Sequence, residues 1–205
     1  MIAGLTVADL ARPSEMRLAR FYDATLVVGG SLVIAGCAQI AIGYPVPMTG
    51  QTFAVLMVAA LLGARRGALC VLTYLAEGLL GLPVFAQGKA GLAAFFGPTG
   101  GYLVGFVAAA YLVGTLAQRG WDRRSATAIL MMLLGNVVLY ACGLAWLLCL
   151  VHLLAQPLGG KGVLAVGLYP FIASEAVKIA LAMALLPCGW KMIRYFGLDR
   201  AADIH

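Results

Sequence analysis

Long apolar stretches separated by short polar breaks dominate the hydropathy pattern along the chain. A membrane-spanning helix needs about 20 mostly apolar residues. Stretches of roughly this length, bounded by charged residues or by Pro and Gly clusters, occur six times. They cover residues 24–44, 48–64, 67–85, 100–118, 126–154 and about 164–187. The pattern predicts an all-α integral membrane protein with six transmembrane helices.

Two of these segments have unusual lengths. At 1.5 Å per residue the second spans only about 25 Å, so we expect one of its ends to join a loop that dips into the protein. The fifth is long enough that it should tilt or extend beyond the bilayer. The predicted organisation is one membrane domain over residues 1–205, with an interfacial lead-in (1–23), a six-helix core (24–190) and a cytoplasmic tail (191–205).

Composition supports a lipid environment for most of the surface. Hydrophobic residues make up 63% of the chain, charged residues 11%, and the mean hydropathy is +0.98. Soluble domains carry roughly 25% charged residues, and disordered chains are poor in apolar ones, so both classes are excluded. The expected location is the cell (inner or plasma) membrane, crossed several times.

The positions of the Lys and Arg residues predict how the chain is oriented in the membrane. One side of the six predicted spans carries Arg12, Arg17, Arg20, Arg65, Arg66, Arg119, Arg123, Arg124, Lys191, Arg194 and Arg200, whereas the other carries only Lys89 and Lys161. Because Lys and Arg concentrate on the cytoplasmic side, both termini are predicted to be cytoplasmic. The net charge of +6 is explained in this way, and we expect no nucleic-acid partner.

Ionisable side chains inside a span are costly, so each is a functional candidate. Glu175 and Lys178 are three residues apart and can pair on one helix face. They indicate a ligand site reachable from outside, with an internal ion pair that fixes packing as the alternative. Glu77 could line the same cavity, contact a neighbouring helix or face lipid in its protonated form.

The loops on the outer side are apolar and rich in Gly and Pro, and we interpret them as lids rather than ordinary connections. The first, residues 44–52, offers Thr49, Gln51 and Thr52 as uncharged hydrogen-bonding groups. The second runs from Gly81 to Tyr102. The sequence contains neither a Walker-type nucleotide loop nor a Gly-x-Ser-x-Gly motif, and its cysteines form no CxxC pair. We therefore expect no catalytic residues, no metal and no cofactor.

The segments VPMTGQTFAVLMVAALLGARRGALCVLTYLAEGLLGLPVF and GPTGGYLVGF, followed by the late acidic-xx-Lys pair, resemble the BioY family over about residues 24–190. These proteins are the biotin-specific substrate-binding subunits, or S components, of energy-coupling factor (ECF) transporters. The resemblance implies a compact six-helix protein whose outward-facing pocket, closed by the loop between the first two spans, holds biotin. Energy would come from two cytoplasmic ATPases coupled through a transmembrane T component. An autonomous carrier that works without the ATPases is the alternative.

The resemblance also implies roles for particular residues. The acidic residue and lysine of the family's last helix correspond to Glu175 and Lys178, with Glu where Asp is usual. Gln87 corresponds to a polar contact near the pocket. The apolar walls are expected to include Tyr74, Phe85 and Phe53, while the sequence leaves open which end of biotin lies deeper. For the T component, the small residues of the first span give Gly30, Ser31 and Ala35 as the expected interface, with tight packing inside the chain as the alternative.

Overall fold

The structure, a computed structural model, describes residues 4–43, 46–153 and 162–195 and is built mainly from helices. The long ones are α1 (Met16–Ala38), α2 (Gln51–Leu62), α3 (Ala64–Leu79), α5 (Gly100–Gln118), α6 (Ser125–Leu153) and α8 (Ile172–Tyr195). The short ones are α4 (Gly91–Phe95) and α7 (Val163–Gly167), with 3-10 turns η1 (Val7–Ala11), η2 (Ala86–Gly88), η3 (Trp121–Arg123) and η4 (Tyr169–Phe171). An antiparallel pair of two-residue strands, β1 (Ala41–Ile42) and β2 (Met48–Thr49), joins α1 to α2. The all-α prediction omitted this hairpin.

Each of the six predicted apolar segments overlaps one of these long helices. Within the described ranges, four helical segments are long and apolar enough to cross a membrane, namely Met16–Ala38, Gly100–Gln118, Ser125–His152 and Val163–Tyr195. The second predicted segment is a short helix, as expected: α2 has 12 residues, and the chain turns directly into α3 at Gly63. Gly63 has a φ of +86°, a conformation that favours glycine.

Several helix boundaries differ from the predicted ones: α1 ends at Ala38, α3 ends at Leu79 and α8 begins at Ile172, each inside its predicted segment. Helix α1 begins at Met16, after the acidic N-cap residue Glu15, so residues 16–23 of the predicted lead-in are helical. Helix α8 continues through Pro187 to Tyr195, beyond the predicted end at 187. A proline is tolerated inside an apolar membrane helix because neighbouring helices can satisfy the backbone groups that it frees. The predicted span ends at residues 44 and 154 and the tail beyond residue 195 lie outside the described residues.

The N-terminal segment is anchored to the helices by a charged cluster. Arg66 of α3 bonds to Asp9 of η1 at 2.7 Å and to Asp23 of α1 at 2.8 Å. Thr6 donates its backbone N–H and its hydroxyl to Asp9. Burial by itself raises the pKa of Asp9, but the hydrogen bonds from Thr6 and Arg66 and the Arg66 charge outweigh it, so this pKa lies below its usual value.

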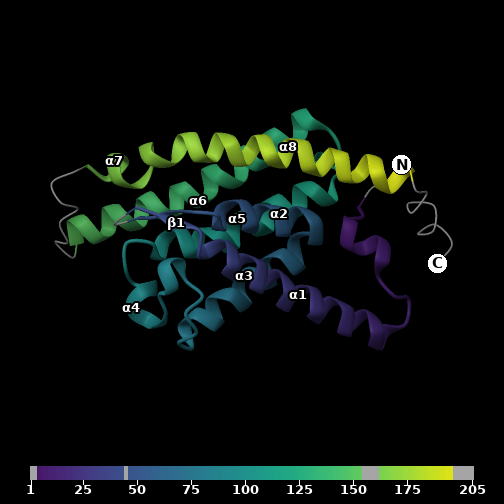
Figure 1. Cartoon of the computed structure of the whole chain (residues 1–205), viewed down its shortest axis with the longest axis horizontal. Coiled ribbons are helices and arrows are strands. Elements are labelled where there is room, and N and C mark those ends of the chain that lie inside the picture. The colour runs from purple at the N-terminus through teal and green to yellow at the C-terminus, as the bar shows by residue number, and fades with distance from the viewer. Residues whose placement is uncertain (1–3, 44–45, 154–161, 196–205) are drawn as a thin grey trace.

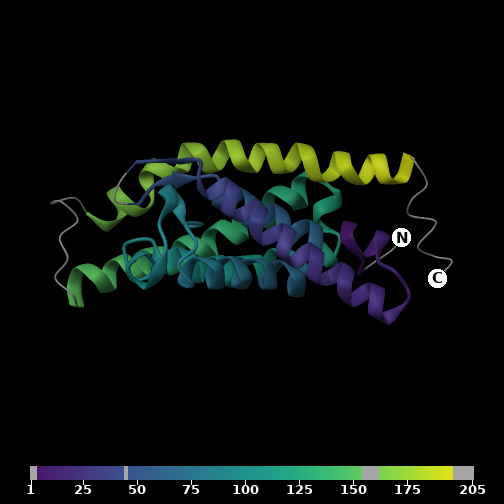
Figure 2. The ribbon, with the colours of Figure 1, turned by 60° about the horizontal axis from the view of Figure 1, so that its bottom comes forward.

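Helix α5 forms the centre of the molecule and packs against α2, α3 and α6. Figure 1 shows α6 and α8 along one side and α1 and α3 along the other, and Figure 2 shows α8 at one edge. Close contacts depend on small residues: a Cβ on Gly114 of α5 would lie 2.4 Å from the backbone nitrogen of Ala64, and one on Gly67 would lie 2.7 Å from Cα of Ala59. Such approach is typical of packed membrane helices.

The carboxyl-terminal part of α8 is joined to the turn between α5 and α6. Trp190 donates its indole N–H to Oδ2 of the buried Asp122, and the Arg123 guanidinium lies 4.5 Å from the centre of the Trp190 ring. Burial raises the pKa of Asp122 above its usual value, more than the Trp190 hydrogen bond and the Arg123 charge lower it. The amino-terminal end of α8 contributes to the site described next.

Candidate functional site

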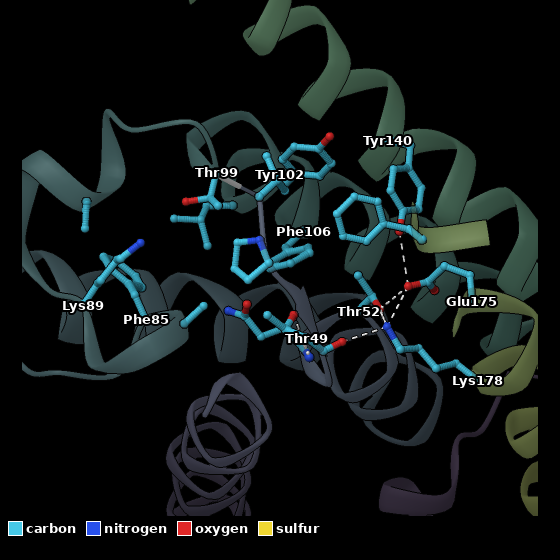
Figure 3. Close-up of a pocket in the computed structure, with 17 residues that line it drawn as sticks. Thr49, Thr52, Phe85, Lys89, Thr99, Tyr102, Phe106, Tyr140, Glu175 and Lys178 are labelled. Carbon is cyan, nitrogen blue, oxygen red and sulfur yellow. Dashed lines mark hydrogen bonds and ion pairs between the residues drawn. The ribbon is translucent and has the colours of Figure 1, made fainter. Parts of the chain in front are cut away.

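A pocket lies where the hairpin, the second loop and the ends of several helices meet (Figure 3). Its walls come from segments far apart in the sequence. They are Val46, Pro47, Thr49, Gln51, Thr52, Phe85, Ala86, Lys89, Ala94, Thr99, Tyr102, Leu103, Phe106, Tyr140, Phe171, Glu175 and Lys178. Most of these side chains are apolar or aromatic, and a few polar groups converge among them, the usual character of a small-molecule site.

The predicted pair of Glu175 and Lys178 lies in this pocket. Pro170 is in the turn η4 that leads into α8, so the pair falls in the first two turns of the helix. The Lys178 ammonium bonds to Glu175 Oε1 at 2.7 Å, to the Thr49 carbonyl at 2.7 Å and to Thr52 Oγ1 at 2.8 Å. Its three N–H donors are thus all used inside the chain. Lys178 therefore holds the hairpin and α2 against α8.

All the hydrogen bonds that described residues donate to Glu175 go to one of its two carboxylate oxygens. Oε1 accepts hydrogen bonds from Lys178, from Thr52 at 2.8 Å and from Tyr140 at 3.2 Å (Figure 3). No described residue donates to Oε2. Glu175 lines the pocket and is only 7% exposed, so its second oxygen is an acceptor with little access to water. Such an acceptor suits an N–H group of a neutral ligand.

Four further predicted residues belong to the pocket or support it. Thr49 and Gln51 line it, as does Phe85. Tyr74 is fully buried behind them: Gln51 donates its Nε2–H to the Tyr74 hydroxyl at 2.5 Å, and the Phe85 ring packs edge-on against Tyr74 at 5.6 Å. Tyr74 thus positions two wall residues and is not itself a wall.

Two predicted residues are not part of the pocket lining. The Gln87 side chain is exposed and donates to the Gly43 carbonyl at 3.1 Å, which joins the second loop to the hairpin. Its φ of +63° is rare for a residue other than glycine. Phe53 is partly buried and packs against the hydrophobic core. Gln51 and Thr52 face the pocket from the first turn of α2. Phe53 is in the same turn, but successive residues of a helix point in different directions, so it does not face the pocket.

The three small residues of α1 that were predicted to contact the T component are buried within the chain. Ser31 is fully buried and Ala35 is 8% exposed, while a Cβ on the buried Gly30 would lie 2.4 Å from Cys70 Sγ of α3. The Ser31 hydroxyl lies 2.9 Å from Glu77 Oε1. Packing inside the chain is thus the alternative that the structure supports, and Glu77 contacts a neighbouring helix.

Sequence reasoning missed several residues of the site. Tyr140, Tyr102 and Phe106 line the pocket, and no local pattern sets them apart from other aromatic residues in apolar helices. Thr52 was expected only as a polar group of the first loop, and its bonds to Glu175 and Lys178 depend on the packing of α2 against α8. Lys89, the only basic residue of the second loop, reaches the pocket from its exposed side.

Comparison with known proteins gives a consistent result. The sequence model of the BioY family matches residues 12–195. A biotin transporter BioY of Thermotoga maritima is 36% identical over 155 residues, which cover 74% of this chain and 84% of that protein. The biotin transporter BioY of Rhizobium etli is 37% identical over 179 residues, covering 83% of this chain and 90% of the relative.

A solved structure agrees with these relatives. It is a crystal structure described as the S-component for biotin from an ECF-type ABC transporter. It superposes with a TM-score of 0.68 and 26% sequence identity, and the match covers 87% of this chain and 95% of the other. Taken with the matched residues 12–195, this similarity extends over the helices that build the pocket. The chain belongs to the BioY family.

Proposed function

We propose that this chain is a biotin-binding S component of an ECF-type vitamin transporter and that biotin occupies the pocket beside Glu175. Membership of the BioY family, relatives named as biotin transporters and the likeness to a biotin S-component support the proposal. The observation that carries it is the buried Glu175 carboxylate, which lines a pocket with aromatic walls and whose Oε2 accepts no hydrogen bond from the described residues. Binding, and not catalysis, is the proposed activity.

The geometry favours one orientation of biotin. The cyclic urea carries N–H donors that suit Glu175 Oε2, while the apolar ring system and side chain suit the walls formed by Phe85, Tyr102 and Phe106. The ligand carboxylate then points toward Lys89, the exposed cation at the other end of the pocket. Lys178, whose donors are used within the chain, holds Glu175 in place instead of binding the carboxylate.

The proposed topology has six crossings, with both termini in the cytoplasm. The beginning of α1 and the end of α8 lie at the same end of the molecule, away from α4 and the hairpin (Figure 1). Four basic residues of the predicted cytoplasmic side belong to these two helix ends and are exposed, namely Arg17, Arg20, Lys191 and Arg194. In the proposed topology the pocket lies at the outer face of the inner or plasma membrane.

We further propose that transport requires a T component and a pair of cytoplasmic ATPases, since the sequence has no nucleotide-binding loop of its own. The autonomous carrier remains the second candidate because the same pocket would serve it. Uptake of biotin by vesicles that contain this chain alone, compared with vesicles that contain the full complex and ATP, separates the two. Equal accumulation in both would contradict the need for the ATPases.

The direct test is titration of the purified protein with biotin in the absence of ATP, with thiamine and riboflavin as control ligands. Saturable binding of biotin alone is the expected result. Folded protein that binds none of the three, or binds them equally, would overturn the proposed ligand. A melting temperature that rises with biotin concentration provides the independent check that binding is to the native state.

A further inference from the structure

The pocket shares a wall with a second cavity that the proposed function does not use. Tyr140, Phe171 and Glu175 line both the pocket and a groove between α6 and α8. The groove measures about 490 Å³ and is lined mostly by aliphatic side chains. A wall only one side chain thick, with open space behind it, is a place where the pocket can change shape.

The pocket needs such a change. The space inside it is about 50 Å³, enough for only a few water molecules. A bicyclic ligand with an aliphatic side chain is far larger, so side chains must move when it enters. Protein interiors are close-packed, and a buried ring can turn only toward unfilled space. For Tyr140 the groove provides that space.

Tyr140 is also the least tightly held donor at Glu175. Its hydroxyl lies 3.2 Å from Oε1, whereas Thr52 and Lys178 bond to the same oxygen at 2.8 and 2.7 Å. Three donors on one carboxylate oxygen compete for its lone pairs. Of the three donors, Tyr140 is therefore the one that a ligand entering the pocket beside Glu175 displaces first. Tyr140 is only 8% exposed, so its released hydroxyl then needs another acceptor within the protein.

Asn136 provides one in the groove. It lines the groove, is only 7% exposed, and its Oδ1 is buried without a hydrogen-bond partner among the described residues. It precedes Tyr140 by four residues on α6, so the two lie on one helix face. Long side chains on helices lean toward the N-terminus, over residues i−3 and i−4, which brings the Tyr140 ring toward Asn136.

We propose that Asn136 is the second acceptor of Tyr140: the hydroxyl bonds to Glu175 in the empty protein and turns to Asn136 Oδ1 when a ligand N–H occupies Glu175. Asn136 is thus a positioning residue that makes room for the ligand and satisfies the displaced hydroxyl. This inference rests on the proposed function, because biotin is the ligand used to test it.

The test combines affinity with the stability of the empty protein. Asn136→Val removes the acceptor, so we expect biotin to bind about 2- to 10-fold more weakly, the effect of one hydrogen bond. The melting temperature without biotin should stay the same or rise, because an unpaired buried amide is replaced by an apolar group. Asn136→Leu carries the same expectation should the valine variant fold poorly. Leu130→Val, on the exposed face of the same helix and outside the groove, is the matched control.

A Tyr140→Phe background tests the link between the two residues. Without the hydroxyl, Asn136→Val should have no further effect on affinity, so the two changes are not additive. Unchanged affinity of Asn136→Val overturns the inference, as does a loss of equal size in the Tyr140→Phe background. A lower melting temperature of the empty variant with unchanged affinity assigns Asn136 to packing alone. Wild-type protein that does not bind biotin contradicts the proposed function itself, and the inference then falls with it.

Discussion

Replacing Glu175 by Gln tests the centre of the site with almost no change in side-chain size. The glutamine oxygen is expected to take the Oε1 position, where Lys178, Thr52 and Tyr140 donate. The NH₂ group then faces the pocket in place of the Oε2 acceptor. A ligand N–H would meet another donor, and the opposite amide orientation would place the NH₂ against three donors.

The magnitude follows from the kind of bond that is lost. A hydrogen bond to a charged group contributes about 1.5 to 3 kcal/mol, which corresponds to about 10- to 150-fold weaker binding. The Lys178 charge also loses its partner in a region where its side chain is 16% exposed, so the variant should melt at a lower temperature than wild type.

The assay is calorimetric titration with biotin in nanodiscs, alongside a thermal melt. Glu15→Gln, a change at an exposed residue before α1, is the matched control and should bind like wild type. A folded Glu175→Gln variant with wild-type affinity would refute the reasoning, because it would show that no ligand N–H depends on the Glu175 charge.

Three further predictions concern the second loop and the two aspartates outside the membrane-spanning segments. Gln87→Ala removes the bond to the Gly43 carbonyl, so the hairpin should open more readily and biotin should dissociate a few-fold faster, measured by chasing bound radiolabelled biotin with unlabelled ligand; an unchanged rate would show that this bond does not restrain the hairpin. For Asp9, whose pKa is lowered by folding, the stabilisation is complete above the usual carboxyl pKa and is lost as the pH falls through the lower folded value, so Asp9→Asn should make the melting temperature less sensitive to acid. For Asp122 the pKa is raised by folding, so the folded state loses stability as the pH rises from the usual carboxyl pKa through the raised pKa. Asp122→Asn keeps an oxygen that accepts from Trp190. This variant should melt at a higher temperature than wild type at neutral pH and at a similar temperature in acid. Equal pH profiles for the variant and wild type would contradict each assignment.

The sequence predicted the helices well because lipid imposes a strong and local constraint. A helix in lipid must hide its backbone and present apolar residues, so hydropathy alone located the six segments in which the long helices lie. Among the described residues, four helical segments are long and apolar enough to cross a membrane. Helix ends were less accurate: α1 begins at Met16 and α8 ends at Tyr195, because charged residues at the membrane edge are compatible with a helix that continues past the apolar stretch.

The candidate site was predictable only where its signal was local. Glu175 and Lys178 stood out as charges at helical spacing, and Thr49 and Gln51 as polar groups in an apolar loop. Tyr140 had no such signal, since an aromatic residue in an apolar helix is ordinary until its hydroxyl is seen beside Glu175. Gln87 and Phe53 are the opposite case. Their residue types suit a pocket lining, but their side chains contact the hairpin and the hydrophobic core instead.

The sequence alone determined the membrane class, the apolar segments and the i, i+3 pair of Glu175 and Lys178, because all of these depend on neighbours along one helix. Tertiary structure alone decided which surfaces are covered. It buried Ser31 and Ala35 against α3, and it brought Thr52 and Tyr140 from two other helices onto one carboxylate oxygen. The physical reason is that the packing of helices joins residues more than a hundred positions apart, and these contacts leave no periodic trace in the chain.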